Sequence, residues 1–213
     1  MRHLSFLDHV ICELDTAVRT LLVPKQRTAR RPSPGQEFPE RSLSAQEKQH
    51  IAGLMRVNHT GEVCAQALYQ GQALTAKLTE VKVQMAEAAE EEVDHLAWCE
   101  QRLNELNSQV SLLNPLWYSG SLMLGMIAGL AGDRWSLGFV AETERQVTAH
   151  LEKHLGNLPA QDDKTKAILA QMQVDEAHHA QVARDAGALE LPFWIKQLMS
   201  GVSKLMTKSS YYI

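Results

Sequence analysis

Apolar residues recur every three or four positions through most of this chain, which is the period of an amphipathic α-helix. Alanine, leucine, glutamate and glutamine, which favour helix, dominate the same stretches. The pattern predicts a short N-terminal helix at residues 4–22 and four longer helical segments, at 44 to about 77, 80 to about 106, 116–156 and 161–187. A shorter helix is predicted to begin at Pro192. The fold class expected is therefore all-α.

Polar and proline-containing stretches separate these segments. Ser44 and Glu47 have capping-box spacing, and Thr79 is the predicted N-cap of the next helix. Asn114-Pro115 restarts the chain, and Pro159 ends the glycine-interrupted region 116–156. The run from Lys25 to Pro39 has four basic residues and three prolines, which is typical of a linker. We therefore expect a helix and linker in residues 1–43 and one domain in 44–213.

Length and composition agree with one globular helical domain. The chain has 213 residues, of which 45% are hydrophobic, 22% charged and 6% aromatic. A net charge of -4 gives no cationic footprint for nucleic acid. Cys12, Cys64 and Cys99 form no CxxC pair, so neither a disulfide framework nor a zinc ribbon is expected. The N-terminus lacks the pattern of a secretion signal.

Two segments have the composition of surfaces that meet lipid. Residues 112–132 contain no charge and approach the length that crosses a bilayer, so spanning, buried and interfacial placements are all open, with the interfacial one preferred. The segment is also expected to belong to the third bundle helix. In the last helix, Trp194, Leu198, Val202, Leu205 and Met206 share one face, with Lys196, Lys204 and Lys208 near the other. Its alternative is an ordinary helix that covers the core.

Two Glu-x-x-His motifs are the most informative feature of the chain. They are Glu92 to His95 in the second long helix and Glu176 to His179 in the fourth, and this spacing puts both side chains on one face. Because roughly 0.7 matches are expected by chance in such a composition, one motif alone would carry no weight. A third match that begins at Glu47 is assigned to chance.

The position of both motifs within their helices distinguishes them from chance. Apolar residues three or four positions apart bracket each pair, so the acids and imidazoles lie on the stripes that face the core. An unpaired buried carboxylate costs several kcal/mol, and a metal ion would compensate its charge. The alternative is a salt bridge, for which Arg102 and Arg145 are the nearest candidates.

A four-helix metal site needs one inward acid from each of the other two helices. Glu62 lies on the inner stripe of the first helix. In the third, Glu144 lies on the apolar line while Glu142 turns away. Glu62 and Glu92 are 30 residues apart, and Glu144 and Glu176 are 32 apart, as two helical hairpins of equal design would produce.

This set of ligands is typical of ferritin-like di-iron and di-manganese four-helix bundles. Two divalent ions would balance four carboxylates, and oxygen donors with one imidazole per ion suit iron or manganese better than zinc. Iron is the occupant we expect. His59, Asp94, His150 and His178 are candidates to orient these ligands, or equally to be exposed polar residues.

The chain resembles the demethoxyubiquinone hydroxylase family. The motifs that carry the resemblance are Arg56-Val-Asn-His-Thr-Gly-Glu62, Tyr69-Gln-Gly-Gln72, Glu92-Val-Asp-His-Leu96, Pro115-Leu-Trp117 and Asp175-Glu-Ala-His-His179, within about residues 45 to 208. The resemblance implies that the iron ligands are Glu62, Glu92, His95, Glu144, Glu176 and His179, with Glu92 and Glu176 bridging two iron ions. Eukaryotic members tend to have His-His-Tyr in the third helix, where this chain has Ala149-His150-Leu151.

The activity that the resemblance implies is hydroxylation of 2-polyprenyl-3-methyl-6-methoxy-1,4-benzoquinol to 3-demethylubiquinol with O2 and an external electron donor. No catalytic residue beyond the metal ligands is expected. Such a substrate stays in the lipid phase, so we expect peripheral attachment to the cytoplasmic side of the cell membrane. Assembly into a homo-oligomer or a ubiquinone-biosynthesis complex is also open. The alternatives are ferritin-like iron oxidation and storage, and a non-catalytic helical scaffold at the membrane.

Overall fold

The computed structural model describes residues 5–22 and 27–213, and these form α-helices and one short 3-10 helix without any strand. The elements are α1 (Phe6–Leu21), η1 (Pro34–Glu37), α2 (Ala45–Thr75), α3 (Thr79–Glu105), α4 (Asn114–Leu130), α5 (Asp133–Asn157), α6 (Asp163–Asp185) and α7 (Phe193–Tyr212). The prediction of an all-α fold is confirmed. The expected start of the first helix at residue 4 and of the linker at Lys25 lie outside the described residues.

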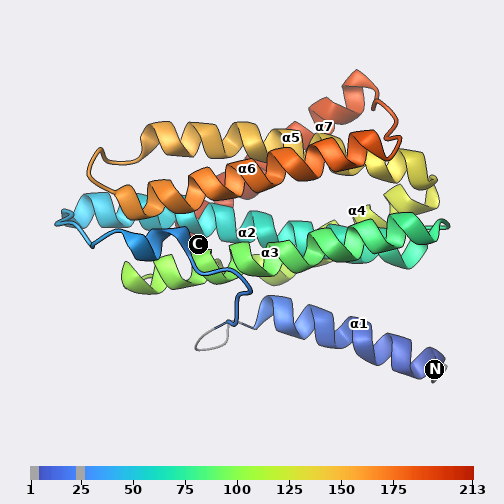
Figure 1. Ribbon diagram of the computed structural model, residues 1–213, viewed down its shortest axis with the longest axis horizontal. Helices are drawn as coiled ribbons and strands as arrows, with labels where there is room; N and C mark the ends of the chain where they lie inside the picture. The colour runs from blue at the N-terminus through green and yellow to red at the C-terminus, as the bar shows by residue number, and fades with distance from the viewer. Residues whose placement is uncertain (1–4, 23–26) are drawn as a thin grey trace.

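Four long helices form the bundle as two hairpins, α2 with α3 and α5 with α6 (Figure 1). Between the hairpins, α4 carries the chain back along α2, and α7 follows α6 and packs on α2 and α5 (Figure 1). The ferritin-like four-helix bundle with an added N-terminal and C-terminal helix is the arrangement that the helical periodicity and the repeated motifs predict.

The two predicted helix starts have different outcomes. Ser44 caps α2 as expected. Its hydroxyl accepts a hydrogen bond from the Glu47 amide at 3.2 Å, and the Glu47 carboxylate accepts one from the Ser44 amide at 2.7 Å. The prediction that Thr79 caps α3 is wrong, because the helix already includes Thr79. Instead Asp133, from the start of α5, accepts the amides of Lys77 and Leu78 at 2.9 Å each. A carboxylate from a distant helix thus satisfies amides at this turn.

The region 116–156 is two helices rather than one, and this corrects the prediction that 112–132 supplies part of the third bundle helix. Gly132 separates α4 from α5 with φ at 119°, a conformation that strongly favours glycine. Other glycines make contacts rather than breaks. A Cβ atom on Gly71 would collide with the backbone of α4, and one on Gly125 with the backbone carbonyl of Leu68 in α2. These glycines let α2 and α4 approach closely.

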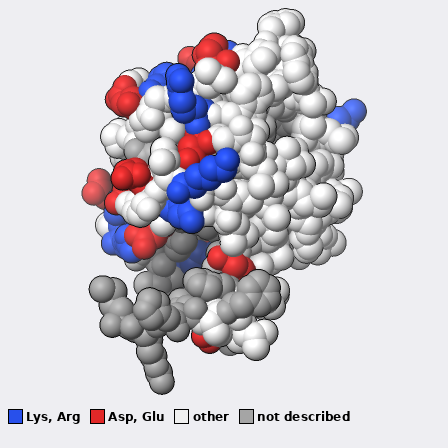
Figure 2. Space-filling view, turned by 90° about the vertical axis from the view of Figure 1, so that its right-hand side faces the viewer, with Lys and Arg blue, Asp and Glu red and all other residues white. Residues whose placement is uncertain are grey.

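Outside its contact with α2, α4 exposes an apolar surface. No helix in the described part of the chain has the length and apolar character needed to cross a membrane. Large apolar side chains of α4 and α7 are nevertheless exposed by 38 to 76%: Leu116, Met123, Leu124, Met126, Ile127, Leu130, Phe193, Trp194, Leu198, Val202 and Leu205. We call these residues the apolar face. In the view of Figure 2 most charged side chains lie on the left, and the right-hand part of the surface carries few charges.

The segment before the bundle lies against it. Ala17 and Leu21 of α1 pack on a buried cluster that includes Val63 of α2 and Tyr118 of α4. After residue 26 the chain runs past α3 toward η1, which contacts α6 (Figure 1). The proline and arginine residues therefore follow the surface of the bundle.

Apolar clusters fill the bundle on both sides of its middle. One contains Ile51, Met55, Leu103, Leu169 and Met172. The other contains Tyr69, Met85, Leu137, Val140 and Ala183. The predicted ligand residues lie between these two stretches of each helix, so packed apolar side chains keep water from both ends of the site.

Candidate metal centre

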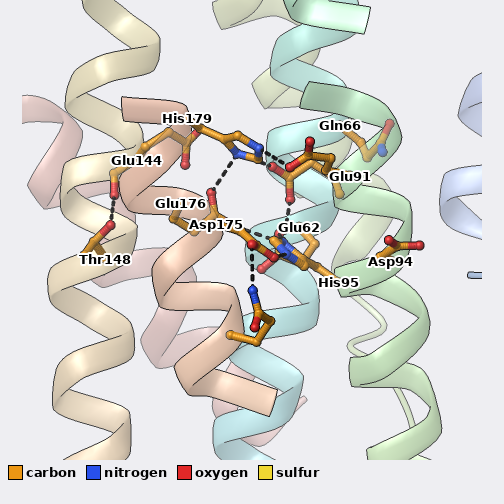
Figure 3. A network of polar contacts seen from close by, with 12 residues as sticks. Glu62, Gln66, Glu91, Asp94, His95, Glu144, Thr148, Asp175, Glu176 and His179 are labelled. Atoms are coloured by element: carbon orange, nitrogen blue, oxygen red, sulfur yellow. Dashed lines mark hydrogen bonds and ion pairs between the residues drawn. The ribbon is translucent and has the colours of Figure 1, made fainter. Parts of the chain in front are cut away.

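Four helices each bring one glutamate to the middle of the bundle, and Figure 3 labels Glu62, Glu144 and Glu176 among them. Glu62 comes from α2, Glu92 from α3, Glu144 from α5 and Glu176 from α6, and none is more than 3% exposed. The apolar stripes predicted this inward placement, because each acid continues the row of core residues on its own helix.

His95 faces three of these acids. Its Nδ1 atom is 3.1 Å from Glu176 Oε1, 3.2 Å from Glu92 Oε2 and 3.7 Å from Glu62 Oε2. One ligand atom from each of these four residues lies within 4.8 Å of the others, which is the spacing of a candidate metal site.

His179 faces the same two motif acids from the other side. Its Nδ1 atom is 3.4 Å from Glu92 Oε1 and 3.4 Å from Glu176 Oε2. Each of the two glutamates thus presents one oxygen to His95 and the other to His179. Glu144 lies beside Glu176 and accepts a hydrogen bond from the buried hydroxyl of Tyr69. All six predicted ligand residues come together in one place.

So much buried acid perturbs the pKa values of the site. Burial raises the pKa of Glu62 and of Glu144 well above the usual carboxyl value, and the neighbouring carboxylates raise it further. Burial would also raise the pKa of Glu92, but His179 and His95 outweigh it and hold that pKa below its usual value. Four carboxyl groups share this buried space, and ionising all of them would require compensating positive charge, which bound cations can supply.

The donor atoms fit a pair of metal ions. Glu92 Oε1, both carboxylate oxygens of Glu176 and His179 Nδ1 are buried without a hydrogen-bond partner. Buried polar atoms normally have partners, and these four all point into the space between the two histidines. Carboxylate oxygens with one imidazole on each side form a donor set that suits iron or manganese.

The salt-bridge alternative has no support among the described residues, where no lysine or arginine lies within ion-pair distance of the four acids. Arg102 instead binds Glu40 at 2.6 Å and Asp162 at 3.0 Å. Arg145 binds Glu142 at 2.7 Å, and this explains why Glu142 is buried although it turns away from the site.

The outer nitrogen of each histidine meets an acid for which the sequence pattern predicted no role. His95 Nε2 is 2.9 Å from Asp175 Oδ2, and His179 Nε2 is 2.9 Å from Glu91 Oε2. Each acid directly precedes a motif glutamate and reaches the histidine of the opposite motif helix. An acid before both Glu-x-x-His motifs was the signal in the sequence. Such contacts orient an imidazole so that its other nitrogen faces the metal.

Of the four residues predicted to orient the ligands, His59 and Asp94 are buried but contact other partners. His59 is 3.2 Å from Glu100 and 3.3 Å from the amide of Asn114. Asp94 accepts the backbone amide of Arg30 at 2.6 Å. Neither contact reaches a predicted ligand directly, although Asp94 also accepts a hydrogen bond from Nε of Arg31 at 2.9 Å.

The other two lie in different surroundings. The His150 ring packs against that of His154, with 3.9 Å between the ring centres. Its Nε2 atom is buried and has no hydrogen-bond partner among the described residues. His178 is exposed beside a small cavity near His179.

An apolar cavity of about 280 Å³ adjoins the site. It lies between α2, α4, α5 and α7, and Glu62 contributes to its wall together with Leu68, Phe139 and Met206. Leu198 and Val202 also line it while being exposed by 63% and 42%, so the cavity reaches the apolar face. Glu62 therefore contributes to both the acid cluster and the cavity.

Comparison with known proteins places this arrangement in a family. The model of the family described as ubiquinone biosynthesis protein COQ7 matches residues 49–210. A protein of Legionella pneumophila (strain Corby) is 68% identical over the full length of both chains, and one of Acinetobacter baumannii (strain ACICU) is 57% identical, also over the full length of both. Both relatives are named 3-demethoxyubiquinol 3-hydroxylase. The family model and the full-length relatives show that this chain belongs to the COQ7 family of demethoxyubiquinone hydroxylases.

Proposed function

We propose that this protein is an oxygen-dependent di-iron monooxygenase that hydroxylates 2-polyprenyl-3-methyl-6-methoxy-1,4-benzoquinol to 3-demethylubiquinol. One observation carries the proposal: Glu92 and Glu176 each direct one oxygen toward His95 and the other toward His179. Two carboxylates in this arrangement suit a pair of ions held side by side. The names of the full-length relatives support the reaction.

The six residues have complementary roles in this proposal. Glu92 and Glu176 would bridge the two ions, while Glu62 with His95 and Glu144 with His179 would complete the two positions. Two iron ions, when bound and reduced, would supply the electrons that activate O2, so that one oxygen atom enters the ring, the other leaves as water, and the external donor restores the reduced ions. The protein's own contribution is orientation and dryness: Asp175 and Glu91 orient the imidazoles, and the two apolar clusters exclude water.

The apolar cavity is our proposed binding site for the quinol. Glu62 at its inner wall would place the aromatic ring next to the metal position, and the walls of Leu68, Phe139 and Met206 suit the ring and the first part of a prenyl tail. The opening beside Leu198 leads the rest of the tail toward the apolar face. Iron storage as in ferritin would not need such a cavity.

The apolar face supports the further proposal that the protein attaches to the cytoplasmic side of the cell membrane as a peripheral protein. Exposed apolar residues of α4 and α7 lie beside the cavity, and a large exposed apolar patch is unusual on a soluble monomer. A substrate with a prenyl tail could then enter from the lipid. An external electron donor and assembly with other copies or other enzymes of the pathway are predictions that accompany this proposal.

Anaerobic reconstitution tests the function. We expect about two iron ions per chain and O2-dependent hydroxylation of a short-chain quinol, with one atom of ¹⁸O2 in the product. A variant that combines Glu92→Ala and Glu176→Ala should lose both, while Glu142→Ala, a buried acid outside the site, should keep the iron. Less than one iron per chain, or unchanged loading in the combined variant, would contradict the site. Iron binding without hydroxylation would favour a storage protein. The loss of both iron binding and hydroxylation would favour a scaffold.

A further inference from the structure

Arg31 connects the segment before the bundle to the candidate metal centre. Its Nη2 atom is 2.9 Å from Asp175 Oδ2 on α6, and its Nε atom donates to Asp94 Oδ2 on α3 at 2.9 Å. One guanidinium group therefore spans the two helices that carry the Glu-x-x-His motifs. Arg31 precedes residues 49–210, the part of the chain that matches the family model.

The contact of Arg31 continues to a predicted ligand. The oxygen of Asp175 that meets Arg31 is also 2.9 Å from His95 Nε2 (Figure 3 shows Asp175 and His95). Because an imidazole has two nitrogens, a fixed acceptor at Nε2 determines that Nδ1 faces the glutamates. The three residues form a continuous row from the protein surface to the metal position.

Packing holds Arg31 in this place. Its guanidinium lies 5.0 Å from the centre of the Trp98 ring, and the Trp98 indole N–H donates to the carbonyl of Arg31 at 3.2 Å. Trp98 is only 1% exposed, and its ring centre is 5.3 Å from that of His95. The same tryptophan thus contacts the ligand and the arginine that supports it. A surface arginine without such contacts would lose much of its effect to side-chain motion and solvent.

In the described part of the chain, the other half of the site has no equivalent cation. His179 Nε2 contacts Glu91, whose side chain is 46% exposed, and among the described residues no lysine or arginine lies within ion-pair distance of Glu91. Asp175, by contrast, is 10% exposed at its side chain and bound by Arg31. The pseudo-repeated motifs are therefore supported unequally.

We propose that Arg31 is a positioning residue that holds Asp175, and through it His95, so that the metal position at His95 is the more rigid of the two. The inference rests on the proposed di-iron function. It assigns a role in the site to the arginine-rich segment, which the pattern of residues indicated only as a linker. It also predicts that iron leaves the two positions at different rates.

Arg31→Met tests the proposal, with Arg30→Met as its matched control. Both changes remove one positive charge from adjacent positions. Among the described residues, however, the Arg30 side chain pairs only with the exposed Glu90, and the contact of Arg30 with Asp94 comes from its backbone. The measurements are iron release to an excess of a ferrous chelator, the Mössbauer spectrum of the ⁵⁷Fe-loaded protein, and urea unfolding of the metal-free protein. A merely structural contact would change unfolding without changing the spectrum.

We expect the control and the unaltered protein to release iron in two phases. In Arg31→Met the slow phase should become about 10-fold faster, which is the lower end of the effect of removing an outer contact of a metal-bound histidine. One of two Mössbauer doublets should shift while the other stays. Arg31→Lys keeps a positive charge that can reach Asp175, and it should restore part of the slow phase. If Arg31→Met does not fold, iron release is measured on Arg31→Lys in its place.

Two results would overturn the inference and leave the function intact. In the first, Arg31→Met binds two irons per chain and has the same release rates and spectrum as Arg30→Met. In the second, Arg31→Met releases iron faster, but Arg31→Lys does not restore the slow release at all. Failure of the unaltered protein to bind iron would instead contradict the proposed function. The two failures are therefore distinguishable in the same set of samples.

Discussion

Replacing Glu144 by glutamine should stabilise the metal-free protein and weaken its binding of iron. Glu144 is 1% exposed, lies beside Glu176 and accepts a hydrogen bond from Tyr69. Glutamine has nearly the same shape, and its carbonyl can accept the same hydrogen bond. The substitution therefore changes little except the charge.

The magnitude follows from charge repulsion. Two carboxylates about 4 Å apart repel each other by about 4 kcal/mol at an effective dielectric constant of about 20, and His179 offsets part of this. Burial raises the pKa of Glu144 above its value in the unfolded chain. The stability that protonated Glu144 contributes is therefore fully present below the pKa of the unfolded chain, and it is lost as pH rises through the pKa of the folded protein. We expect Glu144→Gln to stabilise the metal-free protein by about 1 to 3 kcal/mol at pH 8 and by less at pH 6.

Urea unfolding with a chelator present, at pH 6 and at pH 8, measures this difference. Adding ferrous iron anaerobically should reverse the order, because a ligand at about 1,000 times its Kd stabilises the folded protein by about 4 kcal/mol, and the substituted protein binds it more weakly. The reversal separates a site that evolved to hold cations from a cluster of acids that only weakens the fold.

Glu142→Gln is the control for this experiment. Glu142 is also buried on α5, but Arg145 and Gln146 bind it, and their contacts outweigh burial and lower its pKa. Its stabilising effect is present above the unfolded pKa, so glutamine should destabilise by about 1 kcal/mol at both pH values. If Glu144→Gln destabilises the metal-free protein as Glu142→Gln does, or if its effect does not grow with pH, the reasoning about repulsion is wrong.

Three further predictions concern other parts of the molecule. Gly125→Ala should destabilise the protein by about 1 to 3 kcal/mol in urea unfolding, because the added Cβ would collide with the backbone of Leu68. An unchanged unfolding midpoint would contradict the close approach of α2 and α4. Burial lowers the pKa of His154 to about 3, so the free energy of unfolding should fall by about 3 kcal/mol as pH falls from 6.5 to 4.5. A His154→Gln variant with the same pH dependence of unfolding would refute this. Leu198→Asp on the exposed side of α7 should reduce flotation with lipid vesicles several-fold without lowering iron content, and equal flotation would exclude this part of the apolar face from lipid contact.

The sequence by itself determined most of the helices and the inward placement of the predicted ligand residues. Helical periodicity is a local property, so the row of apolar residues around Glu62 or Glu144 showed which side of each helix faces the core. The choice of Glu144 over Glu142 depended on that row alone. The cap at Ser44 could also be predicted, because its partner Glu47 is three residues away.

Tertiary structure alone decided which distant groups meet. Asp133 binds the amides before α3, although a local rule indicated Thr79. Gly125 looked like a helix break and is a contact, because nothing in its neighbours in sequence shows that α2 passes beside it. Arg31 and Asp175 are joined only because the bundle brings α6 next to the segment before α2. Sequence patterns report the periodicity of one helix, whereas ion pairs, caps and close approaches depend on the packing of several helices, and no local pattern contains that information.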